Sequence, residues 1–278
     1  MIKFVDIDAL FGQYMKERVT KNEENLSYEE WENKIPALYE EFGKQHFKEL
    51  DGKTPETYYA AASGKELADA LGSQIENGQS VSEYLCAAIV HKPDAEKPLI
   101  AMLDSDNEEK TMYALNLLGE MGSKEAVSKY VELAAYGEGD EHIRELAAEL
   151  LIDQCEAGKE IIFRQIHDVD DETKALFCDV LSRCAKDERI YEVLQDAFLT
   201  HPAQATLYSS YLARYGDERF LPVLYEAIER PGIDYGEFRE LKFAIETLGG
   251  EYENERDFSE DKVYRKLKNE NNARKQKK

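Results

Sequence analysis

The chain has 278 residues, enough for one large domain or two of ordinary size. Its 35 lysines and arginines against 58 acids give a formal charge of −23, and 42% apolar residues exclude a fully disordered chain. Only 7 prolines and 16 glycines favour helices over a turn-dense β-protein. No apolar run reaches the roughly 18 residues of a membrane-spanning helix, so no membrane partner is expected. Four irregularly spaced cysteines and a start without a signal-peptide core predict a reducing, cytoplasmic location.

The charge is unevenly distributed along the chain. Residues 262–278 hold eight lysines and arginines against one acid, a formal +7, so the other 261 residues carry −30. A body this acidic repels nucleic acid and attracts basic partners. We expect the basic tail to be a solvated, disordered end, with docking on RNA as the alternative.

The apolar spacing of residues 1–91 predicts a helical N-terminal region. Within 27–42 the apolar residues recur at steps of four, three and four, after a capping-box pattern of Ser27 and Glu30. Pro36 either kinks this helix or marks the first turn of a shorter one. Further helices are predicted from Thr54-Pro55, over about 64–76 and over about 80–91.

From residue 92 to about 250 the chain is repetitive, with a period near 31 residues. Segments 187–198 (DERIYEVLQDAF) and 217–228 (DERFLPVLYEAI) are identical at six of twelve positions. The helix expected before each such segment has apolar residues at i, i+3, i+4 and i+7, which form one helix face. One helix pair cannot bury such a face alone, so the pairs are expected to stack. The last apolar position of the five helices holds Met121, Cys155, Cys184, Tyr215 and Leu248.

Short turns are expected between the two helices of each unit. Gly122, Gly158 and Gly216 are predicted to lie in these turns, because glycine tolerates the left-handed conformation that ends a helix. Ser123 and Asp217 follow two of these glycines and are predicted to cap the next helix.

The repeats resemble the HEAT-like family, including its phycobilin-lyase type of short repeat. The resemblance rests on residues 118–123 (LGEMGS) and 212–217 (LARYGD), and on Pro222, where that family often has a proline early in the other helix. The unit around Cys155 lacks the aspartate after glycine, and the one near Cys184 lacks the glycine. The family implies an α-solenoid that usually binds protein, with a minority of enzymes.

The expected fold class is therefore all-α. A right-handed α-solenoid of about five stacked antiparallel helix pairs is expected over 92–250, after the helical region 1–91. Residues 251–278 are expected to form a C-terminal segment with the basic tail.

Motifs for nucleotides and calcium are incomplete. Residues 52–54 (GKT) resemble the end of a phosphate-binding loop, but Phe47 replaces the first glycine that the loop needs. Stretches 104–108 and 168–172 alternate oxygen ligands as calcium loops do, yet lack the glycine of the sharp turn. We interpret all three as helix-start turns and caps.

No catalytic residue, metal ligand or cofactor site is predicted. No two of the five histidines are four residues apart, so a two-histidine zinc site on a helix is not expected. Cys155 and Cys184 fall in the predicted buried column, where a free cysteine acts as a small apolar filler.

One polar column is a candidate binding site. Arg183 and Arg214 occupy equivalent positions in neighbouring repeats, whose helices pack roughly 8–10 Å apart. Asp179, Ser210 and Glu246 lie on nearby turns. Such columns line the inner surface of a solenoid, and two arginines there suit carboxylates or a phosphate. The alternative is a solvent-exposed, salt-bridged helix face.

These observations favour a non-catalytic cytoplasmic scaffold or adaptor that binds a protein partner with basic segments through the inner solenoid face. One alternative is a solenoid-type enzyme, or a protein that handles a chromophore or another small molecule. The other is an adaptor whose basic tail docks on RNA or the ribosome while the acidic solenoid holds a protein.

Overall fold

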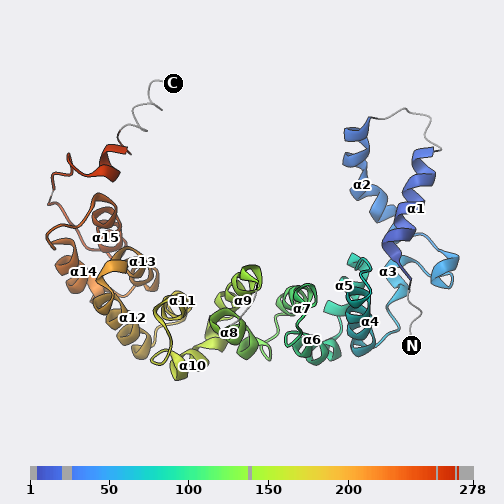
Figure 1. The fold of residues 1–278 in the computed structure, drawn as a ribbon, viewed down its shortest axis with the longest axis horizontal. Coiled ribbons are helices and arrows are strands. Elements are labelled where there is room, and N and C mark those ends of the chain that lie inside the picture. Colours follow the sequence, from blue (N-terminus) through green and yellow to red (C-terminus); the bar gives the residue numbers. More distant parts are fainter. Residues whose placement is uncertain (1–4, 21–26, 137–139, 255, 267, 269–278) are drawn as a thin grey trace. The chain divides into compact units, whose positions relative to one another are not determined.

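The structure is a computed structural model (Figure 1) that describes residues 5–20, 27–136, 140–254, 256–266 and 268. These residues form α-helices and short 3-10 helices without any β-strand, which confirms the all-α class. None of the helices in these ranges is both long and apolar enough to cross a membrane. The chain divides into two compact units, Met1–Ala147 and Ala148–Lys278, within helix α9 (Glu141–Asp153). Most of the predicted basic tail lies outside the described residues.

Helix starts in the first unit follow the predicted caps. The Ser27 hydroxyl accepts the Glu30 N–H at 3.3 Å, and the Glu30 carboxylate accepts the Ser27 N–H at 2.8 Å. Thr54 is the N-cap of the helix that begins at Pro55. The elements of this unit before α9 are α1 (Ile7–Thr20), α2 (Tyr28–Gly43), η1 (Lys48–Leu50), α3 (Pro55–Tyr58), α4 (Gly64–Glu76), α5 (Glu83–Val90), η2 (Pro93–Ala95), α6 (Glu96–Met102), α7 (Glu108–Met121) and α8 (Val127–Tyr136).

Helix α2 continues through Pro36, so the alternative of a shorter helix starting there is wrong. The proline ring costs the helix a backbone hydrogen bond, which tertiary packing of the last turn offsets. In that turn Phe42 is fully buried and contacts the rings of Phe11, Tyr39 and Phe47.

Helices α4 to α7 pack pair on pair within the first unit. Helix α4 has the predicted bounds and contacts α5 and α6, while α7 packs on both α5 and α6. Leu67 and Leu71 of α4, Leu99 of α6 and Leu118 of α7 are fully buried. This pair-on-pair packing begins before residue 92.

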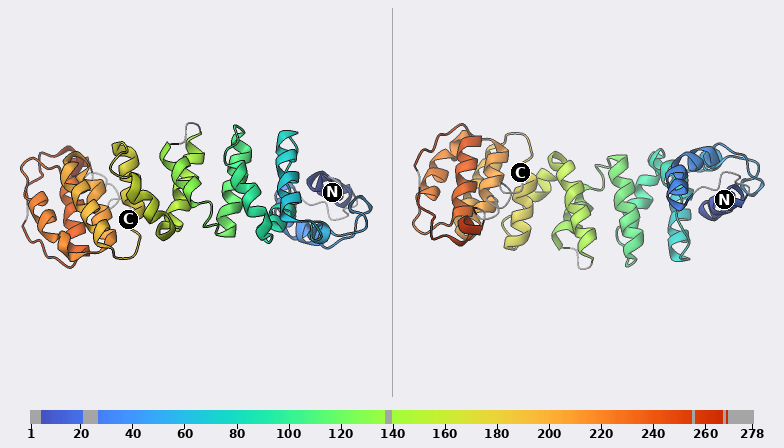
Figure 2. Two further views of the ribbon diagram at one scale, coloured as in Figure 1. Left: turned by 90° about the horizontal axis from the view of Figure 1, so that it is seen from below. Right: turned by 90° about the horizontal axis from the view of Figure 1, so that it is seen from above.

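The second unit arranges its helices in two layers. One layer holds α11, α13 and α15, in which α13 contacts both α11 and α15. The other layer holds α10, α12 and α14, which pack against the first layer (Figure 1). Both views in Figure 2 show these helices side by side. The elements after α9 are α10 (Cys155–Gln165), α11 (Asp171–Leu181), α12 (Glu188–Thr200), η3 (Pro202–Gln204), α13 (Ala205–Tyr215), η4 (Glu218–Phe220), α14 (Leu221–Ile228) and α15 (Tyr235–Thr247).

The predicted apolar columns form the core of the second unit. Equivalent positions of α11, α13 and α15 are buried. These positions are Phe177, Val180 and Leu181 in α11, Tyr208, Tyr211 and Leu212 in α13, and Leu241, Ala244 and Ile245 in α15.

Two of the three predicted turn glycines are confirmed. Gly122 and Gly216 end α7 and α13 with φ of 63° and 72°, in the left-handed region. The prediction for Gly158 is wrong, because Gln154 already caps α10 and Gly158 lies buried inside that helix.

The calcium-like stretches contain helix caps, as expected. The Asn107 side chain accepts the Lys110 N–H at 3.1 Å at the start of α7. The Asp170 carboxylate accepts the Thr173 N–H at 2.8 Å at the start of α11.

Candidate functional site

The two arginines of the predicted binding column converge on one acid. Asp179 of α11 accepts a hydrogen bond from Arg214 Nη1 of α13, and its Oδ1 lies 3.4 Å from Arg183 Nε. Arg214 Nη1 also donates to Ser182 Oγ at 3.1 Å. The guanidinium groups are therefore held by Asp179 within the protein.

The other two column residues have local partners. Ser210 donates to the carbonyl of Leu207 at 2.7 Å, and Glu246 Oε1 lies 3.9 Å from Lys242 Nζ on the same helix. In the part of the chain that the structure describes, no hydrogen bond or ion pair joins either residue to Asp179. The structure thus brings together three of the five predicted residues.

Two exposed apolar side chains lie among these polar residues. Phe243 of α15 is 62% exposed and Leu207 of α13 is 40% exposed. The repeat register places Phe243 at the position of Ser210 in the preceding helix. The sequence interpretation missed both, although a large apolar residue in a polar column is itself informative. We call the surface of Asp179, Arg183, Leu207, Ser210, Arg214, Phe243 and Glu246 the ladder face.

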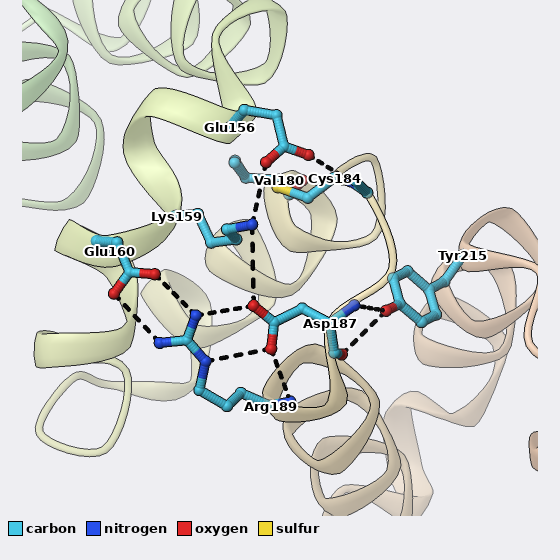
Figure 3. Close-up of polar contacts among 9 residues, drawn as sticks. Glu156, Lys159, Glu160, Val180, Cys184, Asp187, Arg189 and Tyr215 are labelled. Carbon is cyan, nitrogen blue, oxygen red and sulfur yellow. Dashed lines mark hydrogen bonds and ion pairs between the residues drawn. The ribbon is translucent and has the colours of Figure 1, made fainter.

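A second set of contacts links successive repeats at the starts of α12 and α14. Asp187 caps α12 and accepts from both the backbone N–H and Nε of Arg189, at 3.0 and 3.1 Å (Figure 3). Arg189 Nη2 then reaches Glu160 of α10 at 2.7 Å. The arginine thus connects its own helix start with the preceding helix of the same layer.

The next repeat reproduces this arrangement. Asp217 accepts from Arg219 Nε at 3.0 Å, and Arg219 Nη1 donates to Glu188 at 2.9 Å. Each arginine also covers an aromatic ring of the preceding repeat, Phe163 at 4.2 Å under Arg189 and Tyr191 at 3.9 Å under Arg219. We call these linked residues the arginine ladder, with members Glu160, Phe163, Asp187, Glu188, Arg189, Tyr191, Asp217 and Arg219.

Ionisation in the arginine ladder follows from these contacts. Hydrogen bonding to Arg189 lowers the pKa of Asp187 from 3.8 to about 2. The hydrogen bond with Asp187, and to a smaller extent the one with Glu160, raises the pKa of Arg189.

Tyr215 fixes the Asp187 backbone, since its hydroxyl accepts a hydrogen bond from the Asp187 N–H at 2.8 Å and donates one to the Asp187 carbonyl at 3.0 Å (Figure 3).

Two thiols and a carboxylate meet beside the arginine ladder. The ligand atoms of Cys155, Glu156 and Cys184 all lie within 4.8 Å of one another. The Cys184 thiol is buried and donates to the carbonyl of Val180 at 3.7 Å. Burial raises the pKa of Cys184, and the neighbouring Cys155 raises it further. The filler interpretation accounts for the burial of Cys184 but missed the closeness of the two thiols.

A pocket of about 320 Å³ opens between α10, α11 and α12. Its walls combine an apolar floor with both signs of charge. Lys174, Glu192 and Asp196 form no hydrogen bond or ion pair through their side chains within the described residues. The lining residues are Phe163, Ile166, His167, Lys174, Arg189, Glu192, Val193, Asp196 and Ala197.

Comparison with known proteins identifies no relative, since neither a protein-family model nor a curated protein matches the chain. The HEAT-like resemblance therefore rests on the repeats themselves. Function has to be argued from the ladder face, the arginine ladder and the pocket.

Proposed function

We propose that the protein is a non-catalytic scaffold of the HEAT-like α-solenoid type that holds a protein partner on the ladder face. The observation that carries this proposal is the 62% exposure of Phe243, on a helix that also carries the charged residues Lys242 and Glu246. Aromatic residues surrounded by polar groups are typical centres of protein–protein interfaces. Leu207, on the neighbouring helix, adds a second apolar anchor.

The layered packing of the second unit supports the solenoid part of the proposal. Stacked helix pairs present successive helices of one layer as a continuous surface, and that surface is where solenoids usually bind. Asp179, Arg183 and Arg214 connect two helices of that layer through their side chains. Their pairing gives the guanidinium groups a fixed orientation toward a partner's carboxylate.

The charge of the chain supports a basic partner. Outside the 262–278 tail the chain carries a formal −30, which attracts positively charged segments from a distance and speeds their encounter. At physiological salt, exposed charges more than about 8 Å apart are largely screened from one another. Binding is therefore expected to weaken as the salt concentration is raised.

Site-specific crosslinking tests the ladder face. A photoreactive phenylalanine analogue at position 243 is expected to crosslink one defined protein in the cell that makes this chain. The matched control places the analogue at Leu199 of α12, which is 55% exposed and lies on the other layer. The captured protein is then bound in vitro to wild type, to Phe243→Ala/Leu207→Ala and to Leu199→Ala.

The expected result is a loss of affinity of at least about tenfold in the double variant, because central aromatic anchors contribute about 2 kcal/mol or more. Leu199→Ala is expected to bind like wild type. Equal binding by all three proteins would remove the ladder face from the mechanism. Multiple turnovers on a small molecule would overturn the scaffold proposal.

The pocket favours a second candidate, a small-molecule-handling protein. Its volume of about 320 Å³ is at the lower end of small-molecule sites, and Lys174 and Asp196 offer charges of both signs. A zwitterionic metabolite fits this combination best. Screening amino acids and dipeptides by thermal shift tests the candidate, since a stabilising ligand must lose its effect in both Lys174→Met and Asp196→Asn.

A further inference from the structure

The cluster of Cys155, Glu156 and Cys184 has no role in the proposed scaffold function. All three residues belong to the second unit and come from two successive repeats. The cysteines are 29 residues apart, one repeat period, so their positions are equivalent and lie side by side. Two sulfur atoms and a carboxylate within 4.8 Å form a set of possible metal ligands rather than a lone thiol.

We propose that Cys155, Glu156 and Cys184 bind a zinc ion, with water as the fourth ligand. Thiolates select soft or borderline cations such as Zn²⁺ and Cu⁺. The carboxylate favours zinc in this choice, because Zn²⁺ accepts sulfur and carboxylate oxygen together. Three protein ligands and one water complete the tetrahedral arrangement that zinc adopts.

The spacing of the three ligand atoms suits a zinc ion once their side chains move slightly closer together. With Zn–S near 2.3 Å, two sulfurs of a tetrahedral site lie about 3.8 Å apart. The three ligand atoms lie within 4.8 Å, so side-chain shifts of about 1 Å bring them to the ion. Cys155 is half-buried, whereas Cys184 is buried.

Residues around the cluster orient and balance the ligands. One Glu156 oxygen accepts the Ala185 N–H, and the other accepts Lys159 Nζ at 3.0 Å (Figure 3). Ligating carboxylates are usually fixed by such outer hydrogen bonds. Two thiolates and one carboxylate carry three negative charges, of which zinc neutralises two and the Lys159 ammonium faces the third.

Binding releases protons, because both cysteines enter as thiols. Hydrated Zn²⁺ exchanges all but one of its water ligands for two Zn–S bonds and one Zn–O bond to Glu156, two S–H bonds break, and two protons pass to the buffer. The charged groups facing the Cys184 thiol are Glu156 and Lys159 of α10. Lys159 in turn lies 3.8 Å from Asp187, before α12. Affinity is therefore expected to rise with pH in the neutral range.

Titration of the purified, reduced full chain with Co²⁺ tests the site. Tetrahedral Co²⁺ bound by thiolates absorbs visible light and shows a sulfur-to-metal charge-transfer band, which report the ligands directly. One Co²⁺ per chain is expected, displaced by one Zn²⁺. Cys155→Ser is expected to weaken binding by more than about 100-fold, beyond the loss of an outer-shell partner.

Three further variants separate the site from general effects. Glu156→Gln keeps an acceptor for the Ala185 N–H and is expected to weaken binding with the charge-transfer band retained. Cys184→Ala is expected to abolish that band. Cys178→Ala removes a buried cysteine outside the cluster and is expected to bind like wild type. Circular dichroism checks that each variant is folded.

Absence of the charge-transfer band in reduced wild type overturns the proposal. So does a Cys155–Cys184 disulfide that persists in reductant, or equal binding by wild type and Cys155→Ser.

Discussion

Cys184 combines deep burial with an acceptor for its thiol hydrogen. It is 8% exposed, donates to the Val180 carbonyl, and has a raised pKa because of burial. The thiolate is the reactive form of cysteine, so Cys184 is expected to react with a disulfide reagent many times more slowly than a free thiol. Timed labelling with mass spectrometry checks this in metal-free protein. Full labelling of Cys184 at the rate seen in denaturant would contradict it.

Cys178 predicts how alkali affects stability. Burial raises its pKa from 9.0 to about 12, so above pH 9 the unfolded chain loses a proton that the folded chain keeps. The free energy of unfolding is therefore expected to fall as pH rises from 9 toward 12, by up to about 1.4 kcal/mol per pH unit from this group. Urea unfolding of wild type and Cys178→Ala measures the difference. Identical pH profiles would remove Cys178 as a cause.

Which side chains pair with which was the part of the candidate site that sequence alone did not reveal. Equivalent repeat positions predicted that Arg183 and Arg214 are neighbours, but not that Asp179 holds both, because that depends on side-chain conformation. The same argument of equivalent positions applies to Cys155 and Cys184. The closeness of these two thiols was not inferred from the sequence, because free cysteines are often buried in protein cores without any further function.

At the scale of elements, caps and periodicity predicted helix starts well. Ser27 and Asp217 cap as expected because their side chains accept hydrogen bonds from nearby backbone N–H groups. Thr54 is the expected N-cap residue before Pro55, and its hydroxyl pairs with that of Thr57. Gly158 failed because a glycine in a helix interior and a glycine in a turn look alike in sequence. The preceding helix, α9, ends five residues earlier, at Asp153. No glycine or proline marks this helix end in the sequence.

Pro36 lies inside α2 and destabilises this helix, because a proline cannot donate the backbone hydrogen bond of a helix. The side chain is exposed, so Pro36→Ala restores a backbone hydrogen bond without disturbing the core. The helix is expected to gain up to about 3 kcal/mol, and the melting temperature of the first unit to rise. Calorimetry checks the change, with Ala37→Pro as the opposite control. A lower melting temperature for Pro36→Ala would show that the proline is required for packing.

The arginine ladder predicts sensitivity to acid. Because its contacts lower the pKa of Asp187 to about 2, the stability it contributes is present above the ordinary value of 3.8 and is lost as pH falls toward 2. Asp187→Asn is expected to reduce stability at neutral pH and to flatten the profile between those values. Glu192→Gln, an exposed acid of the same helix, is the matched control. Equal acid profiles for wild type and Asp187→Asn would contradict this account.

For the whole molecule, net charge predicts the effect of salt on folding. A formal −23 creates self-repulsion that screening reduces, whereas exposed ion pairs such as Arg219–Glu188 lose little because they contribute little. Adding sodium chloride to physiological strength is therefore expected to raise the melting temperature by a few degrees. Thermal melts at several salt concentrations check this. A steady fall would mean that ion pairs dominate the balance.

The arginine ladder has a direction. Arg189 and Arg219 both reach back to the preceding repeat, to Glu160 and Glu188. Ile161 follows Glu160 where Arg189 follows Glu188, and within the described residues no arginine of a later repeat pairs with Glu218. A second copy of residues 187–216 inserted before Asp217 would preserve each link, because the new arginine finds Glu188 and the new glutamate receives Arg219. A duplication of this segment would therefore lengthen the second unit by one repeat without breaking any arginine–glutamate link.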